Sequence, residues 1–231
     1  MKKLAIYVTI NYPNKEEFFK TLDVLEKCNV DYLELGVPVT NPYMDGQIIK
    51  DSHKQVLDMG LDNKEFYDTL HEIKSKYKNF KLILMTYKEG LIEYALLNNP
   101  DYYDGLLCVD EFVENTNNVN PIQLYNEDLN EEELQLKLKN NMIFAYAMSG
   151  RGKTGSFNSL PDEYKKTMKR IRKYSDIDVL IGFGISTKEH TKSIIDNGAD
   201  GVIIGSNFMK LMGHKDYNLL EQYIMDIKSA L

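Results

Sequence analysis

The chain has 231 residues, of which 43% are hydrophobic and 27% are charged, and its formal net charge is −7. These proportions are typical of a globular protein with a full core, and the length suits a single α/β domain over residues 1–231. The negative charge argues against nucleic acid as a partner. The N-terminal apolar run Leu4–Ile10 is too short for a signal sequence or a bilayer span, so we expect no membrane partner.

The cysteines and histidines show no pattern that is typical of metal ligands. Cys28 and Cys108 lie in apolar surroundings, which predicts buried free thiols in a reducing, cytoplasmic compartment. The histidines are scattered without ligand spacing, and we interpret them as surface or structural residues: His53, His71, His190 and His214. The sequence therefore predicts no metal site.

Short apolar runs alternate with helical patterns along the whole chain, as in a parallel sheet that is covered on both faces. The expected strands begin at Leu4, Asp31, Lys81, Asp104, Pro121, Met142, Val179 and Asp200. The expected helices are one with apolar residues from Phe18 to Cys28, then Gln47–Met59, Asn63–Lys76, Glu89–Leu97, Asn130–Lys139, Leu160–Tyr174, Lys188–Asn197 and Tyr217–Ala230. Eight strands with crossover helices predict a single-domain (β/α)8 barrel of the TIM type.

One helix of this barrel is predicted to be reduced or missing. Residues 111–120, between the fourth and fifth expected strands, contain four asparagines. Asparagine competes with helical hydrogen bonding through its own side chain, so this stretch is a poor helix former. We expect a loop in its place.

Two carboxylates near the second strand are the first candidates for chemistry. Glu34 lies in the apolar run Tyr32–Leu35, where a carboxylate loses hydration and its pKa is displaced. Asp45 follows in a loop whose Asn41-Pro42 and Asp45-Gly46 pairs favour turns. Together they could act as a general acid and base. The alternative is a buried ion pair for Glu34 and a turn role for Asp45.

Glycines at the ends of the last two expected strands predict a phosphate site. These ends read Gly182-Phe183-Gly184-Ile185-Ser186 and Gly205-Ser206-Asn207. Glycine lets backbone N–H groups approach an anion, and barrels commonly bind phosphate at these two loops. The loop around Gly155 and Ser156 could supply further donors.

As an ensemble, these motifs resemble the tryptophan synthase alpha subunit family over nearly the whole chain. The matching segments are Leu33–Pro38, Asn41-Pro42, Asp45-Gly46, Met85–Tyr87, Gly105–Asp110, Tyr146, Gly152–Gly155, Gly182–Ser186 and Ile204–Ser206. The resemblance implies retro-aldol cleavage of indole-3-glycerol phosphate to indole and glyceraldehyde 3-phosphate. It also implies a pyridoxal-phosphate beta subunit as partner in an alpha2beta2 heterotetramer, and no cofactor in this chain.

The resemblance also implies roles for individual residues. Glu34 matches the main acid/base residue, and Asp45 matches the carboxylate that polarises the indole N–H. The residues of this chain that match substrate-binding positions of the family are Asp110, Tyr146, Thr154, Gly155, Gly184, Gly205 and Ser206. Thr154 lies on the loop that closes over the ligand in the family.

The chain departs from the family's pattern on faces where the beta subunit is expected to dock. The departures are Asn41, Gln47, Glu89, Phe112 and the missing helix after the fourth strand. Two alternatives therefore stay open: a non-catalytic phosphate-ligand-binding subunit that activates a beta partner, and a lyase that works alone. A third alternative is a different phosphate-binding barrel, which would usually require an Mg²⁺ site, and the spacing of Glu34 and Asp45 argues against it.

Overall fold

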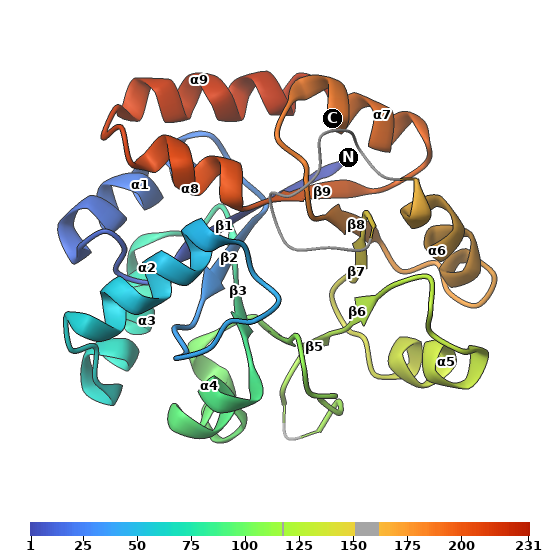
Figure 1. Cartoon of the computed structure of the whole chain (residues 1–231), viewed down its shortest axis with the longest axis horizontal. Coiled ribbons are helices and arrows are strands. Elements are labelled where there is room, and N and C mark those ends of the chain that lie inside the picture. Colours follow the sequence, from blue (N-terminus) through green and yellow to red (C-terminus); the bar gives the residue numbers. More distant parts are fainter. Residues whose placement is uncertain (117, 151–161) are drawn as a thin grey trace.

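Parallel strands form the centre of the molecule and helices surround them (Figure 1). The computed structural model describes residues 1–116, 118–150 and 162–231. The strands are β1 (Lys3–Thr9), β2 (Tyr32–Gly36), β3 (Lys81–Thr86), β4 (Gly105–Cys108), β5 (Pro121–Ile122), β6 (Leu124–Tyr125), β7 (Ala145–Met148), β8 (Val179–Gly182) and β9 (Gly201–Ile204). The helices are α1 (Lys15–Lys27), α2 (Gln47–Asp58), α3 (Asn63–Lys76), α4 (Lys88–Glu93), α5 (Glu131–Lys139), α6 (Glu163–Arg172), α7 (Lys188–Asp196), α8 (Ser206–Met212) and α9 (Tyr217–Lys228). The predicted barrel is confirmed.

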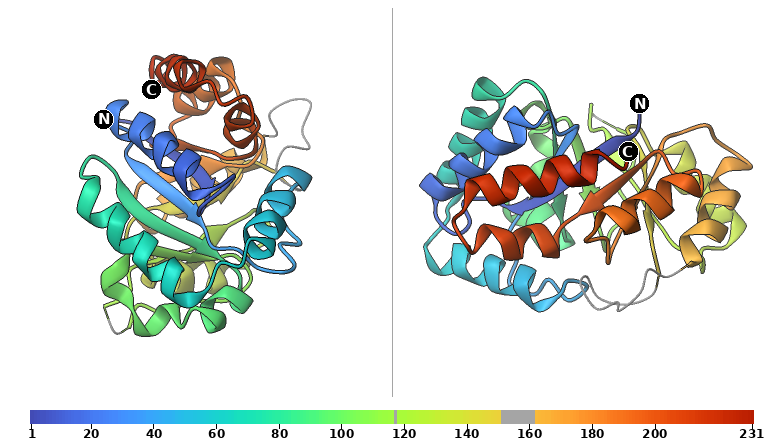
Figure 2. Two further views of the ribbon diagram at one scale, coloured as in Figure 1. Left: turned by 90° about the vertical axis from the view of Figure 1, so that its left-hand side faces the viewer. Right: turned by 90° about the horizontal axis from the view of Figure 1, so that it is seen from above.

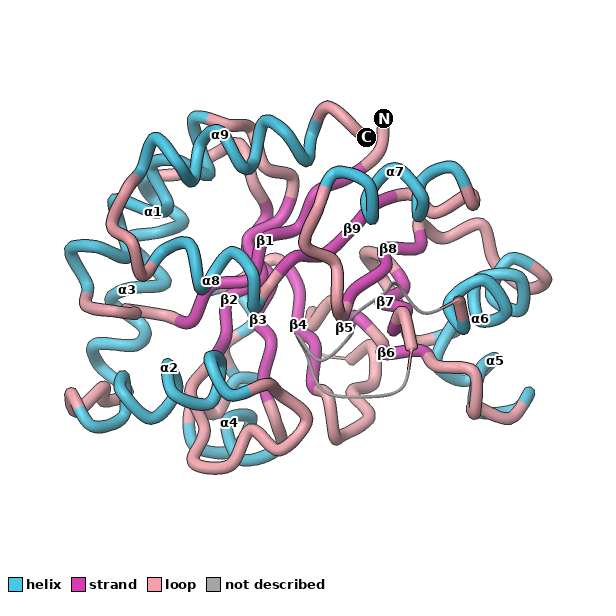
Figure 3. The backbone as a smooth tube through the Cα atoms, turned by 45° about the horizontal axis from the view of Figure 1, so that its top comes forward, coloured by secondary structure: helices cyan, strands magenta, loops and turns pink. Residues whose placement is uncertain are grey.

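The apolar runs that predict strands are buried because both faces of each strand are covered. Residues 4–9 of β1 and all of β2 are buried, since alternate side chains point into the barrel and toward the outer helices. β1 pairs with β2 and β9, so the two ends of the chain meet in the middle of the strand order. Figure 3 shows this band of strands, with the N- and C-termini side by side.

The fifth expected strand closes the barrel in two short pieces. β5 pairs with β4, and β6 pairs with β7, so the barrel is a nine-stranded sheet whose two ends meet at Gln123. The backbone N–H of Gln123 donates to the Asn141 side chain, and its side-chain amide donates to the Val113 carbonyl at 2.7 Å. Side-chain hydrogen bonds at Gln123 thus interrupt the strand that the sequence predicts as continuous.

The missing helix is also confirmed. The described residues between β4 and β5, which are 109–116 and 118–120, form no helix, and Figure 1 shows a loop between α4 and α5. The fourth expected helix ends early, because Ala95 has a left-handed φ of 46° that breaks it before a short 3-10 turn. The expected start of the sixth helix at Leu160 and Pro161 lies outside the described residues.

Gly201 allows β1 and β9 to pair closely. A Cβ at this position would lie 2.3 Å from the Lys3 carbonyl oxygen, which is backbone and cannot turn away. We expect Gly201→Ala to lower the free energy of unfolding by about 1–3 kcal/mol, because overpacking forces backbone shifts. Thermal or urea unfolding measures this change. Gly213→Ala, at an ordinary helical φ of −59°, is the control, and an equal loss in both variants would contradict the steric argument.

Candidate active site

A cavity of about 220 Å³ opens at the carboxyl ends of the strands. It is walled by residues of β1, β2, β3 and β7, by the loops after β2, β8 and β9, and by α2 and α8, which contact each other (Figure 2). Its lining side chains include Tyr7, Glu34, Asp45, Met85, Tyr146, Phe183, Gly184, Ser186, Gly205, Ser206, Asn207 and Lys210. The structure therefore brings both predicted carboxylates and both predicted glycine loops to one cavity.

Glu34 reaches the cavity from the middle of β2. Its neighbours Leu33 and Leu35 are fully buried, and Glu34 itself is only 3% exposed. Its Oε1 atom is buried and has no hydrogen-bond partner among the described residues. Burial, and secondarily the charge of Asp45, raise the pKa of Glu34 to about 8. This carboxyl is therefore protonated at neutral pH and can donate a proton.

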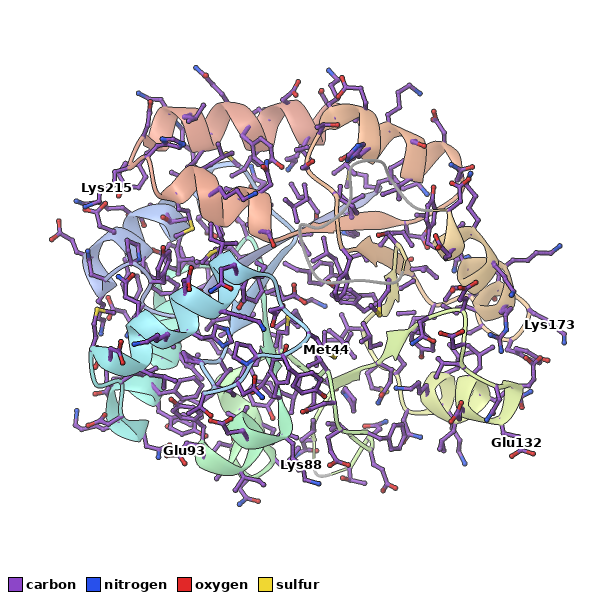
Figure 4. The ribbon with its side chains drawn as sticks, viewed as in Figure 1. Met44, Lys88, Glu93, Glu132, Lys173 and Lys215 are labelled. Carbon is purple, nitrogen blue, oxygen red and sulfur yellow. The ribbon has the colours of Figure 1, made fainter. Side chains whose placement is uncertain are left out.

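Asp45 is held by the end of the neighbouring strand β3. The Tyr87 hydroxyl donates to Asp45 Oδ2 at 2.7 Å and accepts the backbone N–H of Met44 at 3.2 Å. Figure 4 labels Met44 on this loop. Burial raises the pKa of Asp45 to about 6, although the Tyr87 hydrogen bond and Lys50 act in the opposite direction. Asp45 is therefore ionised at neutral pH, while its neighbour Glu34 is neutral.

Two tyrosine–glycine pairs shape the walls beside Glu34. Tyr7 on β1 lies opposite Glu34 in the strand register, and its hydroxyl lies where a Cβ on Gly36 would be. Tyr146 on β7 occupies the corresponding space beside Gly182 of β8. Each ring therefore leans along its neighbouring strand, and only glycine leaves room for it.

The loops after β8 and β9 suit an anion. Phe183 and Gly184 both have a left-handed φ, of 72° and 75°, which turns the chain sharply after β8. Gly205 precedes α8, whose first residue is Ser206, and the buried Ser206 hydroxyl has no partner among the described residues. A sharp glycine turn, a helix start and a hydroxyl without a partner among the described residues together favour phosphate.

The remaining predicted site residues divide into two groups. Asp110 is exposed and does not line the cavity, and its carboxylate accepts the Lys88 backbone N–H at the start of α4. Thr154, Gly155 and Ser156 lie outside the described residues, as do the loop cations Arg151 and Lys153.

Three residues around the cavity escape prediction from the sequence. Tyr7 could have been found from the alternation of β1, which places it on the inner face with Glu34. Lys210 lines the cavity because α8 carries it there, and the periodicity does not predict this short helix. His53 is interpreted above as a surface or structural residue. It is buried, with an exposed fraction of 3%, and its ring is hydrogen-bonded to the Tyr7 hydroxyl, a contact that the sequence does not predict.

The residues that depart from the family's pattern lie on the surface around α4 or near it. The Glu89 carboxylate accepts the backbone N–H of Thr40 at 2.8 Å and its hydroxyl at 3.0 Å, so α4 is tied to the loop after β2. Tyr43 on that loop is 48% exposed and Ile92 on α4 is 71% exposed. Figure 4 labels Lys88 and Glu93, the two ends of α4. Asn41 and Gln47 are also exposed, and Phe112 is half-buried.

Neither a metal-ligand cluster nor a membrane-spanning helix occurs in the described parts of the chain. No group of three His, Cys, Asp or Glu side chains there is arranged to hold a metal ion. No helix in the same residues is both long and apolar enough to cross a bilayer.

Comparison with known proteins identifies the family. The sequence model described as tryptophan synthase alpha chain matches residues 1–228. The tryptophan synthase alpha chain of Petrotoga mobilis is 32% identical over 225 residues, covering 91% of this chain and 86% of the relative. That of Aquifex aeolicus is 27% identical and covers 100% and 93%. A chain from the Pyrococcus furiosus tryptophan synthase complex has the same fold, with a TM-score of 0.84 at 24% identity over 99% of this chain and 100% of that one. The chain described here therefore belongs to the tryptophan synthase alpha chain family.

Proposed function

We propose that this chain cleaves indole-3-glycerol phosphate to indole and glyceraldehyde 3-phosphate, with Glu34 and Asp45 as its acid–base pair. The observation that carries the proposal is that two buried carboxyl groups, with pKa values raised to about 8 and about 6, line one cavity together with the glycine loops after β8 and β9. Environments that separate the pKa values of two carboxyl groups are typical of an acid and a base with different roles. Family membership supports the same reaction.

The chemistry requires a proton to be added and another to be removed. Neutral Glu34 protonates C3 of the indole ring, and ionised Asp45 accepts a hydrogen bond from N1–H and stabilises the positive charge that the ring acquires. The C3–glycerol bond then breaks, and its electron pair returns to the ring as indole forms. The Glu34 carboxylate takes the proton of the adjacent glycerol hydroxyl, which becomes the aldehyde. Glu34 is thereby protonated again.

The glycine loops supply binding energy remote from the breaking bond. We place the substrate phosphate on the backbone N–H groups around Gly184 and Gly205 and on the Ser206 hydroxyl, which come from other loops than the two carboxylates. From the family resemblance we add Thr154 and Gly155 to this set and assign Tyr146 and Asp110 to the substrate region.

We further propose that this chain supplies indole to a beta subunit in an alpha2beta2 assembly in the cytoplasm. The pyridoxal phosphate belongs to that partner, and the alpha chain requires no cofactor of its own. The exposed Tyr43 and Ile92, close to the Thr40–Glu89 contact, support docking at the face formed by α4 and the loop after β2. Aromatic side chains such as Tyr43 are enriched in surfaces that a partner covers.

Indole release from indole-3-glycerol phosphate, measured with and without a tryptophan synthase beta subunit, tests this function. We expect release by the chain alone and stimulation when the partner is present. Phosphate-dependent binding of the substrate without release under either condition would favour the non-catalytic binding subunit instead.

The two pKa values predict a bell-shaped pH dependence of kcat/KM. Activity is lost as the pH falls through about 6, where Asp45 is protonated, and as it rises through about 8, where Glu34 is ionised. Tyr87→Phe removes the hydroxyl that stabilises ionised Asp45, so the acidic limb should move to higher pH. A hydrogen bond to a charged group is worth about 1.5–3 kcal/mol, or roughly one to two pKa units, so we expect a loss of roughly tenfold or more at pH 6 that becomes smaller as the pH rises toward 8.

A second buried tyrosine offers a matched control for this prediction. The Tyr77 hydroxyl donates to Asp23 at 2.8 Å, outside the cavity, and Tyr77→Phe should leave both limbs in place. A uniform loss at all pH values in the Tyr87 variant would contradict its role on Asp45.

A further inference from the structure

The short helix α8 forms part of the cavity wall and is held from several sides. It packs against β1, α2 and α9. Its buried apolar side chains are Phe208, Met209 and Met212. The Asn207 side-chain amide donates to the Ser186 carbonyl at 3.3 Å, and the Tyr223 hydroxyl of α9 donates to the same carbonyl at 2.9 Å. The first turn of α8 is therefore tied to the loop after β8.

Two side chains of α8 share the face that lines the cavity. Ser206 and Lys210 are four positions apart, so they lie one above the other on the same side of the helix. The Cα–Cβ bonds of a helix tilt toward its N-terminus, so a long side chain covers the turn before its own. Both residues line the cavity together with Gly184 and Gly205. The Lys210 side chain therefore extends toward the turn that begins at Ser206.

Neither of these side chains has a partner that satisfies it. The Ser206 hydroxyl is buried and has no hydrogen-bond partner among the described residues. In the same part of the chain, no carboxylate lies within ion-pair distance of the Lys210 ammonium. The remaining residues, 117 and 151–161, include no Asp or Glu. A hydroxyl and an ammonium group on one helical face are thus both available to an anion.

Lys210 also stands out by its charge. It is the single cationic residue among the described side chains that line the cavity, where the carboxyl groups are Glu34 and Asp45. Lys50 on α2 does not line the cavity, and its charge acts on Asp45. A phosphate monoester carries about −1.5 to −2 charges at pH 7, and a chain of net charge −7 repels such a group on approach. Lys210 is placed to offset that repulsion inside the cavity.

We propose that Lys210 is a specificity residue, whose ammonium group recognises the charge of the substrate phosphate and so selects phosphorylated over neutral ligands. The proposal rests on the function proposed above and adds a charged group to its phosphate site. Backbone N–H groups and a hydroxyl bind neutral and charged oxygen acceptors alike, whereas a full positive charge favours an anion. The glycine loops thus give the site its shape, and Lys210 gives it a preference for charge.

Lys210→Met tests this role because it keeps the length of the side chain and removes its charge. We expect KM for indole-3-glycerol phosphate to rise roughly three- to tenfold at an ionic strength of about 0.02 M, and the effect to shrink at about 0.5 M, since salt screens an exposed cation. The phosphate carries the same charge in substrate and transition state, so kcat should stay within about twofold. Lys210→Arg keeps the charge and should retain the wild-type KM.

Lys215 provides the matched control for a change in net charge. It is exposed and follows α8 (Figure 4), and it does not line the cavity. Lys215→Met removes the same charge from the chain and should leave KM unchanged. An equal rise of KM in the Lys210 and Lys215 variants would show an effect of net charge alone and would overturn the proposal.

Equilibrium binding separates recognition of the phosphate from the chemistry. Glycerol 3-phosphate carries a phosphate without the indole ring, and indole carries the ring without a phosphate. In calorimetric titrations at low ionic strength, Lys210→Met should raise the Kd of glycerol 3-phosphate roughly three- to tenfold and leave that of indole unchanged. An unchanged Kd for glycerol 3-phosphate, an equal loss for both ligands, or a loss that persists at high salt contradicts the role of Lys210.

Failure of the proposed function can be told apart from failure of this inference. If the wild-type chain releases no indole, the lyase assignment fails, and the titrations with glycerol 3-phosphate still decide the role of Lys210. If indole is released and Lys210→Met has the wild-type KM and Kd, the lyase assignment stands and the inference fails. A wild-type chain that binds glycerol 3-phosphate no better than glycerol also overturns it.

Discussion

Glu34→Gln is expected to reduce indole release by roughly 10²- to 10⁴-fold, the range that a positioned acid or base contributes. The amide has nearly the same shape as the carboxyl group but cannot donate a proton to C3 or take one from the glycerol hydroxyl. Binding of indole-3-glycerol phosphate should survive, because the proposed phosphate contacts come from the loops after β8 and β9 and do not involve Glu34. Steady-state release and equilibrium binding of the substrate measure the two effects separately.

The stability of the same variant distinguishes lost chemistry from a lost fold. Glu34 is buried and its Oε1 atom is unpartnered among the described residues, so its ionisation opposes folding. Its pKa is raised in the folded state, so this loss of stability develops as the pH rises through the unfolded value of a glutamate. Glu34→Gln should therefore have a Tm no lower than that of the wild type at pH 8. Glu72→Gln, on exposed α3, is the control for release, and parallel losses of binding and turnover in Glu34→Gln would contradict an acid–base role.

Asp45→Asn is expected to lower kcat by roughly 10²-fold or more, because the amide cannot match the charge that develops on the indole ring. The Tyr87 hydroxyl can still donate to the amide oxygen, so the loop after β2 should keep its place. The acidic limb of the pH profile should disappear with the group that produces it. Rates measured from pH 5 to 9 check both points.

A neighbouring aspartate provides the comparison for that result. Asp51 lies exposed on α2 and accepts a hydrogen bond from Gln47, so Asp51→Asn changes the charge near the cavity without changing its lining. We expect less than a twofold effect from a solvated charge of this kind. If Asp45→Asn raised KM alone and kept kcat and its acidic limb, Asp45 would be a binding residue rather than a charge stabiliser.

Local sequence signals account for the barrel and for part of its candidate site. Alternating apolar runs predict the strands, and a carboxylate within one of them marks Glu34, because both signals depend on neighbours in the sequence. The contact of Tyr7 with His53 spans 46 positions, so no local pattern predicts it. Periodicity predicts which face a side chain occupies but not which group on another element will meet it.

The split of the fifth strand shows the same limit in a different form. Pro121–Tyr125 reads as one strand, and the interruption depends on Asn141, which lies 18 positions after Gln123. α8 is too short for its pattern to be separated from that of a loop, and Lys210 therefore could not be placed at the cavity. The position of Asp110 next to α4 likewise depends on where that helix begins.

The place where the barrel closes also explains why this chain tolerates a deletion. The strand order runs from β5 through β4, β3, β2, β1, β9, β8 and β7 to β6, so the strands that carry Glu34 and the two glycine loops lie well inside it. The junction at Gln123, with two register pairs to β4 on one side and two to β7 on the other, lies at the ends of this order, next to the loop that replaces a helix. Fluctuations that open the junction at Gln123 need not disturb the geometry of the reacting groups. Insertions and deletions on that side of the barrel can therefore accumulate with little effect on catalysis.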